Sequence, residues 1–175
     1  LVINQTEETT LGLPALNTLD PFSAHKALHY LKQQGIDYLA FEASSHGLAQ
    51  YRPHAINLEA AGFTNLTQDH LDYHLTMENY FQAKAKLFVE VLPEGKTAVL
   101  NLDSPYFPQL QEICLARSQK ILTYSLKKQA DLSIQNIDQH DRYIEFDLNI
   151  LGQSYVSQRV QLVGRFQLEN LLCAL

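Results

Sequence analysis

Residues 59–88 read EAAGFTNLTQDHLDYHLTMENYFQAKAKLF, and their order of apolar, polar and helical segments indicates the architecture of the chain. A short apolar run ends at Phe63, and a polar loop follows it. Thr76 can then cap a helix, which we expect to run from Met77 to Glu90. An apolar run that leads through a loop into a helix is typical of one strand–helix unit of a parallel sheet. Ligands bind such sheets beyond the carboxyl ends of the strands, where this loop would lie.

The same alternation of strand and helix patterns recurs along residues 1–128. Asp20 followed by Pro21 is typical of a helix start, and Gly35 of a helix end. Another helix is expected from Pro105. Apolar runs typical of buried parallel strands occupy residues 38–41, 60–63, 97–100 and 121–124. These patterns predict an α/β fold, with a mostly parallel sheet flanked by helices.

The hydrophobic pattern changes after residue 130. Apolar side chains at 144, 146, 148 and 150 alternate with polar ones, which is typical of an antiparallel sheet with one dry face. We therefore expect a small antiparallel subdomain at 130–163 within a single domain of residues 1–175. Residues 164–175 return to a helical pattern. Because both ends of the chain fall within expected elements, we expect a domain truncated at both ends.

The composition is typical of a soluble globular protein. Of the 175 residues, 46% are hydrophobic and 18% charged, and the formal net charge of −6 argues against non-specific nucleic-acid binding. No apolar run approaches the roughly 18 residues of a membrane span, so we expect no membrane partner. Cys114 and Cys173 lie in apolar segments, and we expect buried thiols in a reducing, cytoplasmic compartment. A monomer is expected.

Lys84 lies on the apolar stripe of the helix after the polar loop, three residues past Phe81 and four before Phe88. A desolvated ammonium is unfavourable unless it is paired, and burial lowers the pKa of a lysine. Lys84 therefore snorkels, pairs with Asp69 or Asp72, or acts as a neutral amine. A neutral amine can serve as a base or can add carbon dioxide to form an anionic carbamate.

Glu42 follows the expected strand 38–41, so its carboxylate either faces a ligand at the sheet edge or reaches solvent. The adjacent Ser and His in residues 44–47 lack a Gly-x-Ser-x-Gly turn, which argues against a serine hydrolase. Arg52 precedes Pro53 and is therefore expected in extended backbone. Its guanidinium could clamp a carboxylate or phosphate, or it could be a solvated loop side chain.

Two further motifs suggest other chemistry. Gly95-Lys96-Thr97 resembles the end of a phosphate loop, but it leads into a strand and lacks the preceding glycine, so we interpret it as a turn. The polar loop offers four candidate metal ligands, which are Asp69, His70, Asp72 and His74. A metal-dependent hydrolase that uses these four side chains is an alternative hypothesis.

Three ordered motifs carry a resemblance to a known family: FEASSHGL at 41–48, FTNLTQDHLDYH at 63–74 and YFQAKAKLF at 80–88. With NLD at 101–103 and GRFQLEN at 164–170, they resemble the central domain of the Mur ligases. Within that family the motifs are most similar to the MurE group, the UDP-N-acetylmuramoyl-tripeptide synthetases. The resemblance covers nearly the whole chain.

The resemblance implies a central domain of P-loop NTPase type, whose first strand and phosphate loop would precede Leu1 and are missing here. It implies an ATP-dependent amide ligase of peptidoglycan precursor synthesis. In such enzymes ATP is a co-substrate and phosphorylates the D-Glu carboxylate of UDP-MurNAc-L-Ala-D-Glu. The amine of meso-diaminopimelate or L-lysine then attacks the acyl phosphate. We expect this chain alone to be inactive.

The resemblance also implies the roles of individual residues. Glu42, His70 and Lys84, the last as a carbamate, would hold Mg²⁺ and carry the catalysis. Asn170 would lie near the adenine of ATP. The residues that match the family's contacts to UDP-MurNAc-dipeptide are Asn17, Thr18, Leu19, Ser44, Gln50 and Arg52.

Three positions depart from the family pattern. Leu19 stands where a second threonine is common, Leu75 where glycine is favoured, and Gln167 where asparagine is frequent. These departures leave open a third hypothesis, a non-catalytic binding module that keeps the fold.

Overall fold

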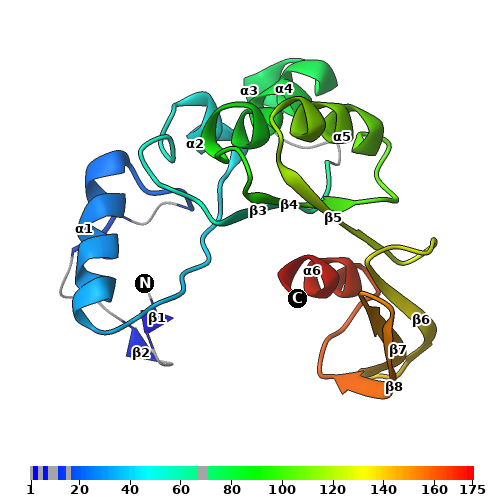
Figure 1. Cartoon of the computed structure of the whole chain (residues 1–175). Coiled ribbons are helices and arrows are strands. Elements are labelled where there is room, and N and C mark those ends of the chain that lie inside the picture. The colour runs from blue at the N-terminus through cyan, green and yellow to red at the C-terminus, as the bar shows by residue number, and fades with distance from the viewer. Residues whose placement is uncertain (1, 4–5, 8–11, 15–16, 67–70) are drawn as a thin grey trace. The chain divides into compact units, whose positions relative to one another are not determined.

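The computed structural model describes residues 2–3, 6–7, 12–14, 17–66 and 71–175 (Figure 1). The chain forms two compact units. Unit 1 comprises residues 1–57 and 70–91, and unit 2 comprises residues 58–69 and 92–175. In the part of the chain that the model covers, no helix is long and apolar enough to cross a membrane.

Unit 1 contains one helix of 13 residues and several shorter elements. A two-stranded antiparallel sheet joins β1 (Val2–Ile3) and β2 (Thr6–Glu7). The helices are α1 (Pro21–Gln33), α2 (Ser45–Ala49), α3 (Leu71–His74), α4 (Met77–Lys86) and the π-helical turn η1 (Leu87–Val91). Helices α2 and α3 both pack against α4.

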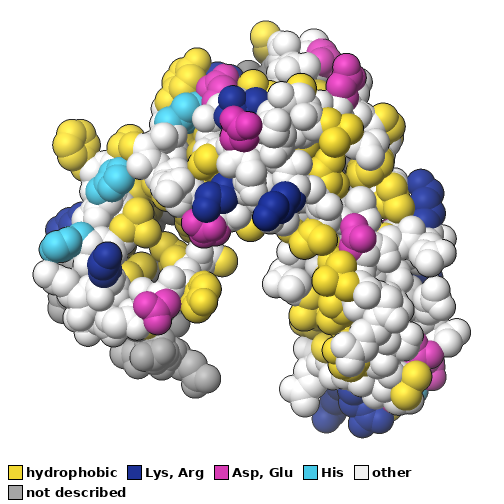
Figure 2. Space-filling view, in the orientation of Figure 1, with side chains coloured by type: hydrophobic (Ala, Val, Ile, Leu, Met, Phe, Trp, Pro, Cys, Tyr) yellow, Lys and Arg dark blue, Asp and Glu magenta, His cyan; other side chains and the backbone are white. Residues whose placement is uncertain are grey.

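Helix α1 begins and ends as the sequence predicts. The Asp20 side chain accepts a hydrogen bond from the Ser23 backbone N–H at 3.1 Å, and Pro21 occupies the first turn. Gly35, just beyond the helix, has a φ of 73°, which favours glycine. Helix α1 buries Ala24, Ala27 and Leu31, and Figure 2 shows histidine and lysine side chains on its outer surface.

Helix α4 has its predicted start and an altered end. The Thr76 hydroxyl accepts from the Asn79 N–H at 3.1 Å, as the expected cap. The regular α-helix stops at Lys86 rather than Glu90 and continues as the wider turn of η1. This turn places Leu87, Phe88 and Val91 in the interior, which is the physical reason for the change.

The predicted strand at residues 38–41 is wrong for this structure. The segment has no strand geometry, and its residues are exposed, with 93% of the surface of Tyr38, 44% of Leu39 and 41% of Phe41 accessible. A strand needs a neighbouring backbone to complete its ladder of hydrogen bonds. Within the described ranges no strand pairs with residues 38–41, so the apolar run forms no ladder and stays exposed.

Unit 2 contains a six-stranded mixed sheet in the order β3-β4-β5-β6-β7-β8. Its strands are β3 (Ala60–Phe63), β4 (Thr97–Asn101), β5 (Lys120–Ser125), β6 (Leu132–Gln139), β7 (Ile144–Ile150) and β8 (Gln153–Val160). Strands β3 to β6 are parallel, and β6, β7 and β8 are antiparallel. The parallel strands end at 63, 101 and 125, within one residue of the predicted ends, and with the later antiparallel strands they confirm the sequence patterns. Gly95 lies in the predicted turn.

Two helices cover the sheet of unit 2. Helix α5 (Phe107–Ala116) packs on β4 and β5, and α6 (Phe166–Ala174) packs on β3 to β6. The core between α6 and the sheet consists of Tyr124, Leu132, Ile134, Ile144, Phe146, Leu168 and Leu172. Cys114 is buried on α5 and Cys173 is half-buried on α6, both as free thiols.

Hydrogen bonds from two polar side chains hold the end of β3, where the polar loop begins. The Tyr124 hydroxyl lies 3.0 Å from the Phe63 carbonyl and 3.1 Å from the Thr64 carbonyl. The Asn101 amide donates to the Thr64 carbonyl at 3.3 Å. Asn101 and Tyr124 thus position the first residues of the loop, although they lie far from it in sequence.

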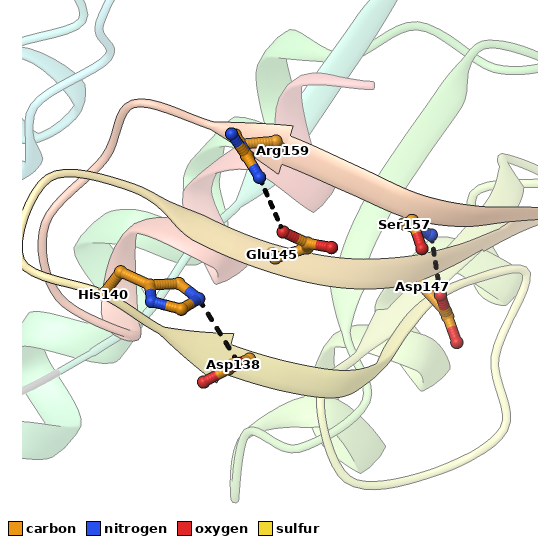
Figure 3. Close-up of polar contacts among 6 residues, drawn as sticks. All are labelled: Asp138, His140, Glu145, Asp147, Ser157 and Arg159. Atoms are coloured by element: carbon orange, nitrogen blue, oxygen red, sulfur yellow. Dashed lines mark hydrogen bonds and ion pairs between the residues drawn. The ribbon is translucent and has the colours of Figure 1, made fainter.

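Two bulges interrupt the antiparallel strands, and one carboxylate binds both. Asn136 on β6 and Ser157 on β8 each have a φ of 50°, close to breaks in the strand register. The Asp147 carboxylate on β7 accepts from the Asn136 amide at 2.7 Å and from the Ser157 N–H at 2.9 Å. Figure 3 shows the Asp147–Ser157 contact beside the Arg159–Glu145 ion pair at 3.1 Å and a contact between His140 and Asp138 at 3.3 Å.

Candidate functional site

The candidate site lies in unit 1 and is organised around Thr18, whose surface is only 3% exposed. The Thr18 hydroxyl accepts from the Ser44 N–H at 2.8 Å and donates to the Glu42 carbonyl at 3.0 Å. It also lies 2.9 Å from the Ser44 hydroxyl. A single buried hydroxyl therefore joins two segments that are 24 residues or more apart.

The segment after Glu42 turns directly into α2. The Ser44 hydroxyl caps this helix by accepting from the Gly47 N–H at 3.1 Å. A Cβ atom at position 47 would lie 2.7 Å from the Thr18 side chain, which explains the glycine there. Thr18, Ser44 and Gly47 thus form one closely packed group.

Arg52 is anchored to the same group. Its Nη1 donates to the Thr18 carbonyl at 2.8 Å, and its Nη2 and Nε donate to the Gln50 Oε1 at 2.6 and 3.1 Å. Tyr51 has a φ of 58°, and the Arg52 N–H bonds the Gly47 carbonyl at 2.9 Å. The guanidinium is therefore held in one orientation at the surface of the site.

Glu42 and Lys84 supply opposite charges to the site. The Asn17 amide lies 3.5 Å from the Glu42 carboxylate. Lys84 is half-buried, in keeping with its place on the apolar stripe of α4. Burial lowers the pKa of the Lys84 ammonium, and the negative charge of Glu42 opposes that shift. The Lys84 Nζ also lies 5.7 Å from the centre of the Tyr80 ring.

His74 is buried rather than open to a metal ion. Its Nε2 is hydrogen-bonded to the Ser45 hydroxyl at 3.0 Å, and its ring stacks on Tyr80. Asp72 is exposed on α3. Among the described residues, no three His, Cys, Asp or Glu side chains converge as a possible metal site. Asp69 and His70, on which the metal hypotheses also depend, lie outside the described residues.

The remaining predicted residues divide between the two units. Leu19 is half-buried beside Thr18 in sequence in unit 1. Asn170 is exposed on α6 in unit 2, and its amide donates to the Gln167 Oε1 at 3.1 Å. Thr18, Ser44, Gln50 and Arg52 are brought together as one bonded group.

Ser45 and Tyr80 belong to the site without having been assigned a role from sequence. Each is almost fully buried, and both contact His74. The sequence carries one signal for Tyr80, which precedes Lys84 by four residues and therefore shares its helix face. It carries none for Ser45, because its partner is 29 residues away.

Comparison with known proteins places the whole chain in one family. A family model described as the Mur ligase middle domain matches residues 3–175. A UDP-N-acetylmuramoyl-L-alanyl-D-glutamate--2,6-diaminopimelate ligase of Anaplasma marginale is 39% identical over 161 residues, covering 92% of this chain and 34% of that protein. The ligase of the same name from Lactiplantibacillus plantarum is 36% identical over 170 residues, with coverages of 93% and 34%.

Solved structures support the same fold. A structure of a ligase with that name aligns with a TM-score of 0.78 and 38% identity, covering 89% of this chain and 32% of the other. A MurF ligase from Thermotoga maritima aligns with a TM-score of 0.62 at 16% identity, covering 93% of this chain and 36% of that one, and shows the fold alone. The chain spans about a third of the length of the curated relatives it matches.

Proposed function

This chain belongs to the Mur ligase family, and we propose that the protein of which it is the middle domain is a MurE-type ligase. In this proposal it joins a diamino acid to UDP-MurNAc-L-Ala-D-Glu with the cleavage of ATP to ADP and phosphate. Diaminopimelate is favoured over L-lysine, because the curated relatives at 36 to 39% identity are named diaminopimelate ligases. The bonded group around Thr18 is the observation that supports a substrate site in this domain.

The proposed reaction has two steps. The D-Glu carboxylate attacks the terminal phosphorus of ATP, and ADP leaves, which produces an acyl phosphate. The amine of the diamino acid then attacks the acyl carbon, phosphate leaves, and the amine loses a proton to give the amide. Reacting anions must be aligned and their charge balanced. The fixed guanidinium of Arg52 and the hydroxyl of Ser44 suit the binding of an anionic muramoyl-dipeptide.

The side chains near Lys84 fit a magnesium site, if that lysine is carbamylated. An ammonium would repel Mg²⁺, whereas a carbamate offers the oxygen ligands that Mg²⁺ prefers, as does the Glu42 carboxylate. A lowered lysine pKa favours the neutral amine, which adds to carbon dioxide and releases a proton. We propose Glu42, His70 and the Lys84 carbamate as ligands. When bound, Mg²⁺ would neutralise charge on the transferring phosphoryl group.

Three further assignments complete the proposal. Asn170 contacts the adenine of ATP from helix α6. The protein works as a monomer in the cytoplasm, and it has neither a nucleic-acid nor a membrane partner. The net charge of −6 argues against a nucleic-acid partner, because it disfavours non-specific binding to the phosphate backbone.

A ligation assay on the full-length protein tests the function. Amide formation and ADP release are measured with UDP-MurNAc-L-Ala-D-Glu, ATP, Mg²⁺ and either diaminopimelate or L-lysine. We expect ligation of diaminopimelate, and a loss of at least about 100-fold in kcat for Lys84→Ala. The control is Lys86→Ala, whose ammonium lies 4.1 Å from the Tyr51 ring and has no proposed role. Failure to ligate either diamino acid refutes the function, and full activity of Lys84→Ala refutes the carbamate.

A further inference from the structure

The imidazole of His74 has no part in the proposed chemistry, yet it contacts both segments that carry it. Its surface is 6% exposed, and its Nε2 lies 3.0 Å from the hydroxyl of Ser45, which is 3% exposed. Ser45 is the first residue of α2 and directly follows the cap residue Ser44. A buried hydrogen bond from His74 therefore restrains the backbone that presents Ser44 to Thr18.

The face of the same imidazole holds the helix that carries Lys84. The His74 and Tyr80 rings stack with centres 5.0 Å apart and planes inclined by 14°. Tyr80 is 6% exposed, one helical turn before Lys84, with its ring centre 5.7 Å from the Lys84 Nζ. His74 thus packs against the ring on which the Lys84 side chain lies.

The backbone of His74 is held as firmly as its side chain. Its carbonyl accepts from the Thr76 N–H at 2.8 Å and from the Asn79 amide at 3.0 Å. Leu75, between them, has a φ of 66°, so the chain turns tightly after His74. Because backbone and ring are both fixed, the imidazole can act as a rigid support between α2 and α4.

We propose that His74 is a positioning residue that sets the location of Ser44 through Ser45 and of Lys84 through Tyr80. The inference rests on the proposed function only in giving Ser44 and Lys84 their tasks. The contacts with Ser45 and with Tyr80 are separable, because the hydrogen bond to Ser45 uses the edge of the His74 ring and the stack on Tyr80 uses its face. Through Ser45, the edge of the His74 ring positions Ser44 for binding of the muramoyl-dipeptide. Through Tyr80, the face of the ring positions Lys84 for catalysis.

Two substitutions in the full-length enzyme separate these contacts. His74→Phe keeps the stack on Tyr80 and removes the bond to Ser45, so the KM for UDP-MurNAc-L-Ala-D-Glu should rise about fivefold with little change in kcat. His74→Gln keeps a hydrogen-bonding amide for Ser45 and removes the ring, so kcat should fall about fivefold with little change in that KM. The control His25→Phe changes an exposed histidine on α1 and should alter neither value.

Ser45→Ala tests the edge contact from the other side, and it keeps the proposal testable if His74→Phe does not fold. It should reproduce the higher KM of His74→Phe, and the double variant should be no worse than either single one. Additive effects in the double variant contradict the edge contact. Variants that lower the melting temperature while kcat and KM stay unchanged contradict the positioning role.

A measurement without turnover separates this inference from the proposed function. In bicarbonate-free buffer, labelling of Lys84 by an amine reagent is followed by mass spectrometry, with Lys86 as the internal reference. His74→Gln should raise the relative labelling of Lys84 about fivefold, because the Tyr80 ring loses its support. If the wild-type protein does not ligate, the proposed function fails, and this labelling still decides the role of His74. Unchanged labelling overturns that role.

Discussion

At the scale of single residues, the candidate site depends on one buried threonine. The Thr18 hydroxyl bonds the backbone of Ser44 and Glu42, and its carbonyl receives the guanidinium of Arg52. Close packing of Thr18 against Gly47 leaves no room for a side chain at position 47. The residues that we propose to bind the muramoyl-dipeptide come from separate segments, and these contacts hold them in one geometry, which would favour binding and alignment.

Arg52 provides the sharpest single-residue prediction. Arg52→Ala in the full-length enzyme should raise the KM for UDP-MurNAc-L-Ala-D-Glu by at least about tenfold, because a charge-assisted hydrogen bond to the anionic substrate is lost. The KM for ATP should change much less, as measured by steady-state kinetics with each substrate varied. Arg142→Ala, an exposed arginine between β6 and β7, is the matched control. A larger effect on ATP would refute the assignment of Arg52.

At the scale of elements, the turn between α3 and α4 explains a departure from the family pattern. Leu75 has a φ of 66° and a side chain that is 77% exposed, so a leucine adopts a conformation there that favours glycine. The left-handed conformation costs a residue with a Cβ about 1–2 kcal/mol. The turn therefore forms despite Leu75, held by the Thr76 and Asn79 bonds to the His74 carbonyl.

Leu75→Gly should stabilise the protein slightly. The relief of about 1–2 kcal/mol of backbone strain is partly offset by about 0.5–1 kcal/mol from the greater freedom of glycine in the unfolded chain. We expect a net gain of about 0.5 kcal/mol in the free energy of unfolding, measured by urea denaturation. Leu75→Ala keeps the Cβ and should give no gain. A loss of stability in Leu75→Gly would contradict this account of the turn.

The antiparallel strands carry a pH-dependent contact at Asp147. Hydrogen bonds from the Asn136 side chain and the Ser157 N–H lower the pKa of the Asp147 carboxyl below its ordinary value. A lowered pKa in the folded state means that this contribution to stability is present above the unfolded-state pKa. It is lost as the pH falls through the lower, folded-state pKa.

Asp147→Asn should therefore lower stability at neutral pH and weaken the fall in stability on acidification. Thermal denaturation between neutral pH and about pH 3 measures both effects. Asp141→Asn, in the loop between β6 and β7, serves as the control. An unchanged pH dependence in Asp147→Asn would show that the carboxylate does not hold the two bulges.

At the scale of the whole molecule, the residues proposed to bind the muramoyl-dipeptide and the residue proposed to bind ATP belong to different compact units. The residues assigned to the muramoyl-dipeptide lie in unit 1, and Asn170 lies on α6 in unit 2. Since the chain spans about a third of the length of its curated relatives, complete ligation is proposed only for the full-length protein.

Asn170→Ala in the full-length enzyme should raise the KM for ATP about fivefold, because the proposed contact of Asn170 with the adenine would be lost. The KM for UDP-MurNAc-L-Ala-D-Glu should stay close to that of the wild type. Gln109→Ala, an exposed residue on α5, is the control for a helix-surface change in the same unit. Equal shifts in both KM values would show that Asn170 supports the fold rather than the nucleotide.

Patterns among neighbouring residues in the sequence were enough to predict most of the helices and strands. The caps at Asp20 and Thr76, the parallel strands ending near 63, 100 and 124, and the alternation after residue 130 all depend on near neighbours in sequence. The motifs also identified the family, since 173 residues match its model. The half-burial of Lys84 followed from helical spacing alone.

Contacts between distant segments account for what could not be predicted. Residues 38–41 have a strand composition, but a strand exists only where another backbone completes its hydrogen bonds. The hydrogen-bond partners of Thr18 lie 24 to 34 residues away, and Ser45 lies 29 residues from His74, so no periodicity marks these contacts. The amino-acid order thus determined the elements, the family and the candidate residues. The tertiary structure determined which of those residues are in contact, because packing and hydrogen bonds between distant segments leave no pattern among neighbouring residues in the sequence.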